Sequence, residues 1–211
     1  MVVTFAVAGL AVALVAAWLA LCRFISPEEQ FKLGLKYRDG NQTTQSYTTA
    51  AQWFQKAADA GYAPAQFELA ALLRLGLGAP QDQDAARRMV EKAAAQGYPP
   101  AVTMAGILET SRVGGDAKQG LVWLKAAANF GDPWAQSWLA FIYMDGRLET
   151  GDPLKALYWI ERAHETDSVN TKDLWRAIWQ SIPPSSRIMT QGVVSSQIGH
   201  IIQPPPGLDN E

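Results

Sequence analysis

Side chains that could perform catalysis or bind a metal ion are few and scattered along the chain. A metal site needs several His, Cys or carboxylate ligands at close spacing, and the chain offers only His164, His200 and Cys22. The sequence contains no Gly-x-Ser-x-Gly nucleophile elbow, and the glycines at 76, 78, 114 and 115 lack the Gly-Lys-Ser/Thr ending of a phosphate-binding loop. We therefore expect no catalytic, cofactor-binding or metal-binding residue and no cofactor.

The overall charge limits the partners that the protein can attract. Its 211 residues include 18 Lys and Arg and 20 Asp and Glu, which gives a net charge of -2. Proteins that bind nucleic acid usually carry a strongly basic face, so we do not expect a nucleic-acid partner. Cys22 is the single cysteine and cannot form a disulfide within the chain, so cysteine usage favours neither a reducing nor an oxidising compartment.

One stretch of sequence occurs three times and indicates an internal repeat. It consists of consecutive alanines, then a glycine, then a proline and an alanine, and it occupies residues 55–66, 91–101 and 125–136. Its glycines, at positions 61, 97 and 131, lie 36 and 34 residues apart. Repeats of this length are pairs of helices that stack on their neighbours. The sequence therefore predicts an all-α fold built from successive helix pairs.

A second landmark recurs in phase with the first. It takes the form Leu-Gly or Leu-Ala, then Tyr or Leu, then Gly, at residues 33–40, 69–76 and 139–146. Together the two patterns resemble the Sel1-like repeat family, which is related to tetratricopeptide repeats, over residues 27–165. The third unit departs from the pattern, with Ala105-Gly106 in place of Leu-Gly and Glu109 in place of Tyr. The resemblance implies an α/α solenoid of about four helix pairs that acts as a scaffold or adaptor.

The ends of the helices are predicted from capping residues. Ser26, Pro27 and Glu29 are a capping-box start for the first helix, which we expect to end near Arg38. Each second helix of a pair should end at a repeat glycine in a left-handed conformation. The remaining helix starts are marked by Pro64, Pro100 and Pro133 in first helices and by Asp82, Asp116 and Asp152 in second helices.

The N-terminal segment is apolar over the length of a membrane span. Residues 2–22 carry no charge and, as a helix, would extend about 31 Å, the thickness of a bilayer core. A cleaved signal peptide is the alternative, but no Lys or Arg precedes the segment and bulky Leu21 precedes Cys22. We expect residues 1–24 to be an uncleaved, single-pass anchor. Because Arg23 and Lys32 follow it, the positive-inside rule favours repeats on the cytoplasmic side of a bacterial inner membrane.

The repeat pattern stops after residue 165, but helical signals continue. Residues 171–179 are amphipathic, and apolar residues recur at roughly helical spacing in residues 185–203. Because a solenoid needs an element that covers its last open face, we expect residues 166–203 to form C-terminal capping helices. Residues 204–211 begin with three prolines and should be a loose polar tail.

The repeat register points to one candidate protein-binding surface. Two matching positions on the first helix of a pair carry Met104 and Ile107 in the third repeat, and Trp138 and Phe141 in the fourth. If first helices line the concave face of the solenoid, these residues form an apolar site for a helix or peptide of a partner. The alternative is that Trp138 and Phe141 pack against a neighbouring helix. Three tryptophans of second helices are expected in the core: Trp53, Trp123 and Trp159.

These features favour a membrane-anchored scaffold that binds proteins of a membrane-associated complex without catalysis. One alternative is a periplasmic assembly or chaperone-like factor for envelope or polymer export, which differs from the scaffold in topology. Another is an enzyme whose site assembles only in space. The sequence does not indicate the oligomeric state.

Overall fold

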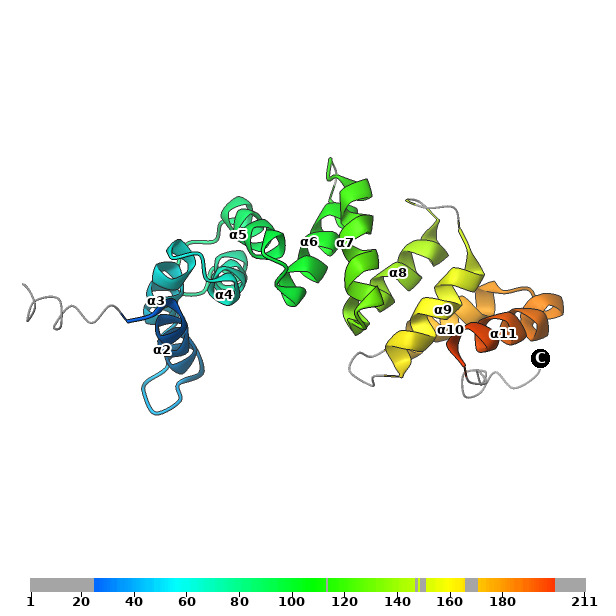
Figure 1. Cartoon of the computed structure of the whole chain (residues 1–211), viewed down its shortest axis with the longest axis horizontal. Helices are drawn as coiled ribbons and strands as arrows, with labels where there is room; N and C mark the ends of the chain where they lie inside the picture. Colours follow the sequence, from blue (N-terminus) through cyan, green and yellow to red (C-terminus); the bar gives the residue numbers. More distant parts are fainter. Residues whose placement is uncertain (1–24, 113, 147, 149–150, 166–170, 200–211) are drawn as a thin grey trace, which may run out of the picture. The chain divides into compact units, whose positions relative to one another are not determined.

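The structure, a computed structural model, describes residues 25–112, 114–146, 148, 151–165 and 171–199. These residues form ten α-helices, α2 to α11, and no strand (Figure 1). The eight helices α2 to α9 follow one another along the chain as the four predicted pairs, which confirms the all-α repeat fold. The chain divides into two compact units, Met1–Gln81 and Asp82–Glu211.

The first unit contains three helices. They are α2 (Pro27–Asp39), α3 (Tyr47–Asp59) and α4 (Ala63–Leu75), and each packs against the next along the chain. Gly34 of α2 explains the Leu-Gly landmark, because a β-carbon at that position would lie 2.4 Å from Cε1 of the Phe54 ring. The missing side chain therefore lets the fully buried Phe54 ring of α3 pack directly against the backbone of α2.

The second unit contains seven helices among its described residues. Neighbours from α5 to α9 pack in order, α6 also contacts α8, and both α10 and α11 pack against α9. Their bounds are α5 (Gln83–Ala95), α6 (Pro99–Ser111), α7 (Ala117–Asn129), α8 (Pro133–Asp145), α9 (Pro153–His164), α10 (Lys172–Ser181) and α11 (Pro184–Ile198). One apolar cluster runs through the unit, from Leu121 of α7 to Val194 of α11.

The helix starts match the predicted caps. Ser26 and Glu29 form the capping box, with the Ser26 hydroxyl accepting from the Glu29 N–H at 3.1 Å and the Glu29 carboxylate accepting from the Ser26 N–H at 3.2 Å. The side chains of Asp82, Asp116 and Asp152 accept from early amides of α5, α7 and α9. Each cap satisfies one or two donors that the first turn of a helix leaves without a partner.

The repeat glycines end the second helices in the predicted left-handed conformation. Gly61, Gly97 and Gly131 have φ angles of 85°, 76° and 90°. After α3, the Gly61 N–H donates to the Ala58 carbonyl at 2.9 Å, and the next N–H, that of Tyr62, donates to the Ala57 carbonyl at 3.0 Å. This pattern of two hydrogen bonds is a Schellman motif, and the same pattern follows α5 and α7. Two alanines before each glycine are buried where the chain turns back, namely Ala57 and Ala58, Ala93 and Ala94, and Ala127 and Ala128.

The prediction that the second-helix tryptophans lie in the core is wrong by one position along the helix. Trp53, Trp123 and Trp159 are half-buried rather than in the core. The next residue along each helix is fully buried instead, namely Phe54, Leu124 and Ile160. A Trp side chain at the edge of the buried face keeps its indole N–H near water while its ring covers apolar surface, so the smaller side chains fill the interior.

Two helices follow the last repeat, and their apolar residues enter its core. Trp175, Ile178 and Trp179 of α10 and Val194 of α11 belong to the apolar cluster of the second unit. The helix α11 ends at Ile198, before Gly199, whose φ is 84°, and residues 200–203 of the predicted segment 185–203 lie outside the described residues. The predicted tail, residues 204–211, and the predicted anchor, residues 2–22, lie outside the described residues. Among the helices that the structure describes, none is long and apolar enough to cross a membrane.

Candidate protein-binding surface

Helices α6 and α8 carry the four residues of the predicted binding surface. α6 begins at two prolines after Tyr98, and α8 begins at Pro133 under the Asp132 side-chain cap. The two helices contact each other, and the indole N–H of Trp138 donates to the Thr110 hydroxyl at 2.9 Å. This hydrogen bond joins α8 to α6 between residues that are 28 positions apart in sequence.

The four predicted residues are all half-buried. The rings of Trp138 and Phe141 lie next to each other, with centroids 5.7 Å apart and planes at 40°. Ile107 and Trp138 also pack against the apolar cluster of the second unit, whereas Met104 and Phe141 are outside that cluster. Trp138 therefore has a structural role as well as an accessible edge. Truncating Phe141 should disturb the packing less than truncating Trp138. We refer to Met104, Ile107, Trp138 and Phe141 as the α6–α8 surface.

The first unit holds a polar version of the Trp138 contact. Glu68 of α4 occupies the repeat position of Trp138, and Arg38 of α2 occupies that of Thr110. The Arg38 guanidinium donates to the Glu68 carboxylate at 2.7 Å and forms a second ion pair with Asp39. The hydrogen bond to Asp39, followed by that to Glu68, raises the pKa of Arg38 above its ordinary value. The same repeat position thus contacts the preceding first helix through an ion pair in one unit and through an indole in the other.

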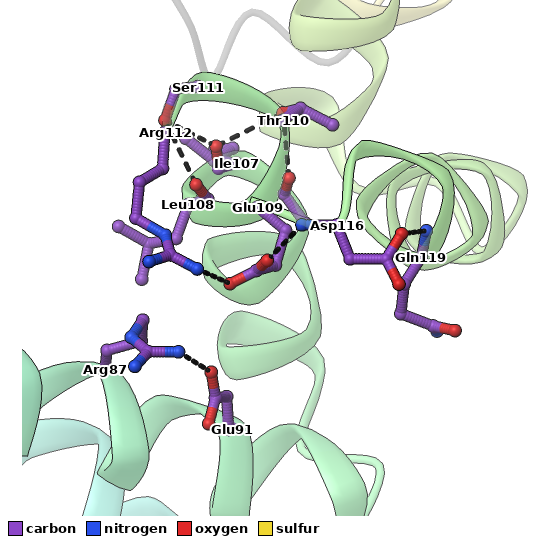
Figure 2. A network of polar contacts seen from close by, with 11 residues as sticks. Arg87, Glu91, Ile107, Leu108, Glu109, Thr110, Ser111, Arg112, Asp116 and Gln119 are labelled. Atoms are coloured by element: carbon purple, nitrogen blue, oxygen red, sulfur yellow. Dashed lines mark hydrogen bonds and ion pairs between the residues drawn. The ribbon is translucent and has the colours of Figure 1, made fainter. Parts of the chain in front are cut away.

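Glu109 replaces the repeat tyrosine by making a contact of its own (Figure 2). Its carboxylate is almost fully buried, accepts from the Asp116 N–H at 2.6 Å and lies 3.7 Å from the Arg112 guanidinium. In the first and fourth repeats the equivalent N–H, of the helix-capping residue, donates to the backbone carbonyl of Tyr37 or Tyr143. A side chain thus replaces a backbone acceptor in the third repeat.

An exposed apolar row on α7 was not predicted from the sequence. It consists of Val122, Ala126, Phe130 and, at the start of α8, Trp134, and we call it the outer row of α7. Val122, Phe130 and Trp134 are 58%, 94% and 60% exposed. Counted back and forward from the repeat glycine, the second repeat has Arg88, Lys92, Gln96 and Pro100 at these positions. Comparing the outward positions of second helices between repeats reveals the row, whereas the positions compared above lie on first helices.

The described residues show no arrangement typical of a metal centre. No group of three or more His, Cys, Asp or Glu side chains in the described part of the chain could hold a metal ion. Two carboxyl groups there are deeply buried, those of Glu109 and Glu161. Glu109 accepts the helix-start hydrogen bond described above, and Glu161 lies in α9 beside the indole of Trp175. Glu109 therefore has a structural role at the start of α7.

Two solved structures with a similar fold are described as repeat proteins. A Sel1 repeat protein from Oxalobacter formigenes matches with a TM-score of 0.67 and 21% identity, covering 82% of this chain and 73% of the other. The protein c5321, described as a protective antigen of uropathogenic Escherichia coli with an SLR fold, matches with a TM-score of 0.67 and 27% identity. That match covers 83% of this chain but only 39% of c5321, so the chain spans less than half of that protein. No curated protein matches the sequence.

A family model gives the most direct comparison. The model for the Sel1 repeat matches residues 30–62, 63–98, 105–132 and 135–164, which correspond to the four helix pairs. The third match is the shortest and begins only at Ala105, in the repeat whose first helix departs from the pattern. Because these matches extend over more than half of the sequence, the chain belongs to the Sel1 repeat family.

Proposed function

We propose that this protein is a membrane-anchored scaffold that binds a protein partner through the α6–α8 surface, without catalysis. Sel1 repeats generally mediate protein–protein interaction, and proteins built from them are typically non-catalytic scaffolds. The fold alone does not select a surface, because function depends on the side chains that the fold presents.

The observation that carries the proposal is the adjacent pair of half-buried aromatic rings on α8. Trp138 and Phe141 lie side by side, with Ile107 on the helix that α8 contacts. Binding energy at protein interfaces is concentrated in a few aromatic or arginine anchors in well-packed surroundings. The hydrogen bond from Trp138 to Thr110 holds one of these rings in a fixed orientation before a partner binds, which lowers the entropic cost of association.

The test compares two truncations in the full chain. Phe141→Ala should weaken partner binding by about tenfold or more, with a small loss of thermal stability, because Phe141 lies outside the apolar cluster. Val122→Ala is the matched control, since Val122 is exposed on α7 and should leave binding unchanged. The partner is isolated by cross-linking in membranes with wild type and then measured against each variant. Equal loss of binding in both variants, or none in Phe141→Ala, would contradict the proposal.

The membrane part of the proposal rests on the sequence of residues 2–22. They are uncharged, and Arg23, Lys32, Lys36 and Arg38 follow them, which favours repeats in the cytoplasm at the bacterial inner membrane. Two fusions to the C-terminal end test on which side of the membrane the repeats lie. One carries a phosphatase that is active only outside the cytoplasm, and the other carries a fluorescent protein that folds only inside it. Strong phosphatase activity would reject this orientation and point to the periplasmic assembly factor instead. A mature N-terminus at Arg23 would reject the anchor.

A further inference from the structure

A buried carboxyl group lies where the last repeat meets the two helices that follow it. We call α10 and α11 the C-terminal cap, and both pack against α9. Glu161 of α9 is 5% exposed, and its Oε1 atom has no hydrogen-bond partner among the described residues. A buried charge without a partner costs free energy, so the neutral acid is the form that this environment favours.

The cap offers this carboxyl group only an incomplete partner. The Trp175 indole of α10 is 7% exposed, and its N–H is buried without a hydrogen-bond partner in the described part of the chain. Burial raises the pKa of Glu161 to about 7, and the nearby indole offsets part of this rise. The contact between α9 and α10 thus contains an acid and a donor that do not satisfy each other.

Neighbouring groups on α9 do not neutralise an ionised Glu161. Glu165, one turn further along the helix, adds negative charge and raises the pKa of Glu161 further. Arg162 is the next residue after Glu161, but its guanidinium lies over the Tyr158 ring, 5.8 Å from the ring centre. Among the described residues of α9, none therefore supplies a cation to the Glu161 carboxylate.

The helices packed against α9 do not supply a cation either. His164 of α9 reaches the cap, with Nδ1 3.0 Å from the Thr171 hydroxyl oxygen and its ring stacked on Trp175, but it forms no ion pair with Glu161. Within the described residues, the ionisable side chains of these helices do not contribute to the pKa of Glu161. They are Tyr143 and Asp145 of α8, Lys172, Asp173 and Arg176 of α10, and Arg187 of α11.

We propose that ionisation of Glu161 opens the C-terminal cap, so that α10 and α11 leave α9 more often as the solution changes from mildly acidic to alkaline. Opening lets water hydrate the carboxylate, which removes the cost of burying it. The cap lies outside the four helix pairs, so it can open as a local unit while the pairs stay folded. The inference depends neither on the α6–α8 surface nor on a membrane anchor.

The test measures how fast a thiol in the cap reacts at different pH values, in the full chain in mild detergent. Cys22→Ser removes the natural thiol, and Ile178→Cys places one at a fully buried position of α10. Each rate is divided by the rate for an exposed thiol, Val122→Cys, at the same pH, which corrects for the effect of pH on thiol reactivity. From pH 6 to 8 this relative rate should rise about tenfold, as expected for a pKa of 4.5 in the open state and about 7 in the closed state.

Three further variants show which group opens the cap and how far the opening extends. Glu161→Gln should reduce the rise to less than about twofold, because its side chain does not ionise. Glu165→Gln is the matched control, since it makes the same substitution at an exposed carboxyl group of the same region, and it should keep most of the rise. A thiol at the buried position Thr103 of α6, as Thr103→Cys, should change its relative rate less than about twofold.

Three outcomes would overturn the proposal. An equal rise in the Glu161→Gln chain would mean that another group opens the cap, and an equal rise at Thr103→Cys would mean that the whole chain unfolds. The third outcome is no rise in the cap itself. If Ile178→Cys prevents the cap from docking, Val194→Cys at a fully buried position of α11 replaces it as the reporter. No partner is used, so the result is independent of the proposed function.

Discussion

Some individual residues are buried at a cost in folding free energy. Glu161 of α9 is 5% exposed, and one of its carboxylate oxygens has no hydrogen-bond partner among the described residues. Burial raises the pKa of Glu161 to about 7; the adjacent Trp175 indole offsets part of this effect, and Glu165 adds to it. His164, also in α9, stacks on Trp175. A carboxyl group at the α9–α10 contact is therefore favoured in its neutral form.

Replacing Glu161 should change how stability depends on pH. Since its pKa is higher in the folded chain than the ordinary value of 4.5, the contribution of Glu161 to stability is fully present below about pH 4.5 and is lost as pH rises through about 7. The loss is at most about 3 kcal/mol. Glu161→Gln should remove this part of the slope, so the variant should melt higher than wild type at pH 8. Melting curves from pH 4.5 to 8 test this.

The exposed Glu165 provides the control at the same helix end. Glu165→Gln should lower the pKa of Glu161 slightly and so reduce the amplitude of the pH transition only slightly, because the charge of Glu165 is the smallest of the three causes that act on the Glu161 carboxyl group. The difference between Glu161→Gln and wild type is the quantity to compare, because every other ionisable group is common to the two proteins. An identical pH slope in both proteins would show that Glu161 is ionised without cost.

Two glycines should respond to alanine with opposite signs. Gly97 has a φ of 76° and no atom near its would-be β-carbon, so Gly97→Ala should cost about 1 kcal/mol from backbone strain alone. Gly192 lies inside α11, also in open space, so Gly192→Ala should stabilise by about 0.5–1 kcal/mol through helix propensity. Chemical denaturation of the full chain measures both. Equal effects would mean that backbone conformation does not distinguish these sites.

At the scale of an element, the start of a helix depends on how the preceding helix ends. α2, α4 and α8 end at left-handed glycines, Gly40, Gly76 and Gly146. The third repeat has Arg112 instead, in extended conformation, because a side chain disfavours the left-handed region. The Glu109 carboxylate then reaches Asp116 at the start of α7.

Removing the Glu109 carboxylate should destabilise the α6–α7 pair. Glu109→Ala loses a charge-assisted hydrogen bond to the Asp116 N–H and leaves that donor without its acceptor, at a cost of about 2–3 kcal/mol. Glu109→Gln keeps an oxygen acceptor and should cost about 1 kcal/mol less. The free energy of unfolding from denaturant titration measures both. The result is contradicted if Gln and Ala are equally destabilising.

At the scale of the molecule, the sequence predicts the features that recur from one repeat to the next. The helix pairs, the aspartate caps and the left-handed glycines follow from local residues at a fixed period, and all are present in the structure. The contacts that differ between repeats could not be predicted, because Arg38 meets Glu68, and Trp138 meets Thr110, only after first helices pack. The cleft lined by Tyr158 of α9 and Val193 of α11 also depends on how a non-repeating helix packs on α9. The outer row of α7 is found only when the outward positions of second helices are compared.

The outer row of α7 should govern association of the whole chain and not its stability. Val122 and Phe130 are exposed, so replacing them by their second-repeat counterparts, as Val122→Arg and Phe130→Gln, removes little buried area and should change stability by less than about 0.5 kcal/mol. Exposed apolar patches promote association, so light scattering at rising protein concentration should show less self-association in the double variant. Leu124→Ala, on the same helix but fully buried, should instead cost about 2–5 kcal/mol. If the double variant were as destabilised as Leu124→Ala, the row would be part of the core. If scattering were unchanged, the apolar side chains would not drive contact between copies.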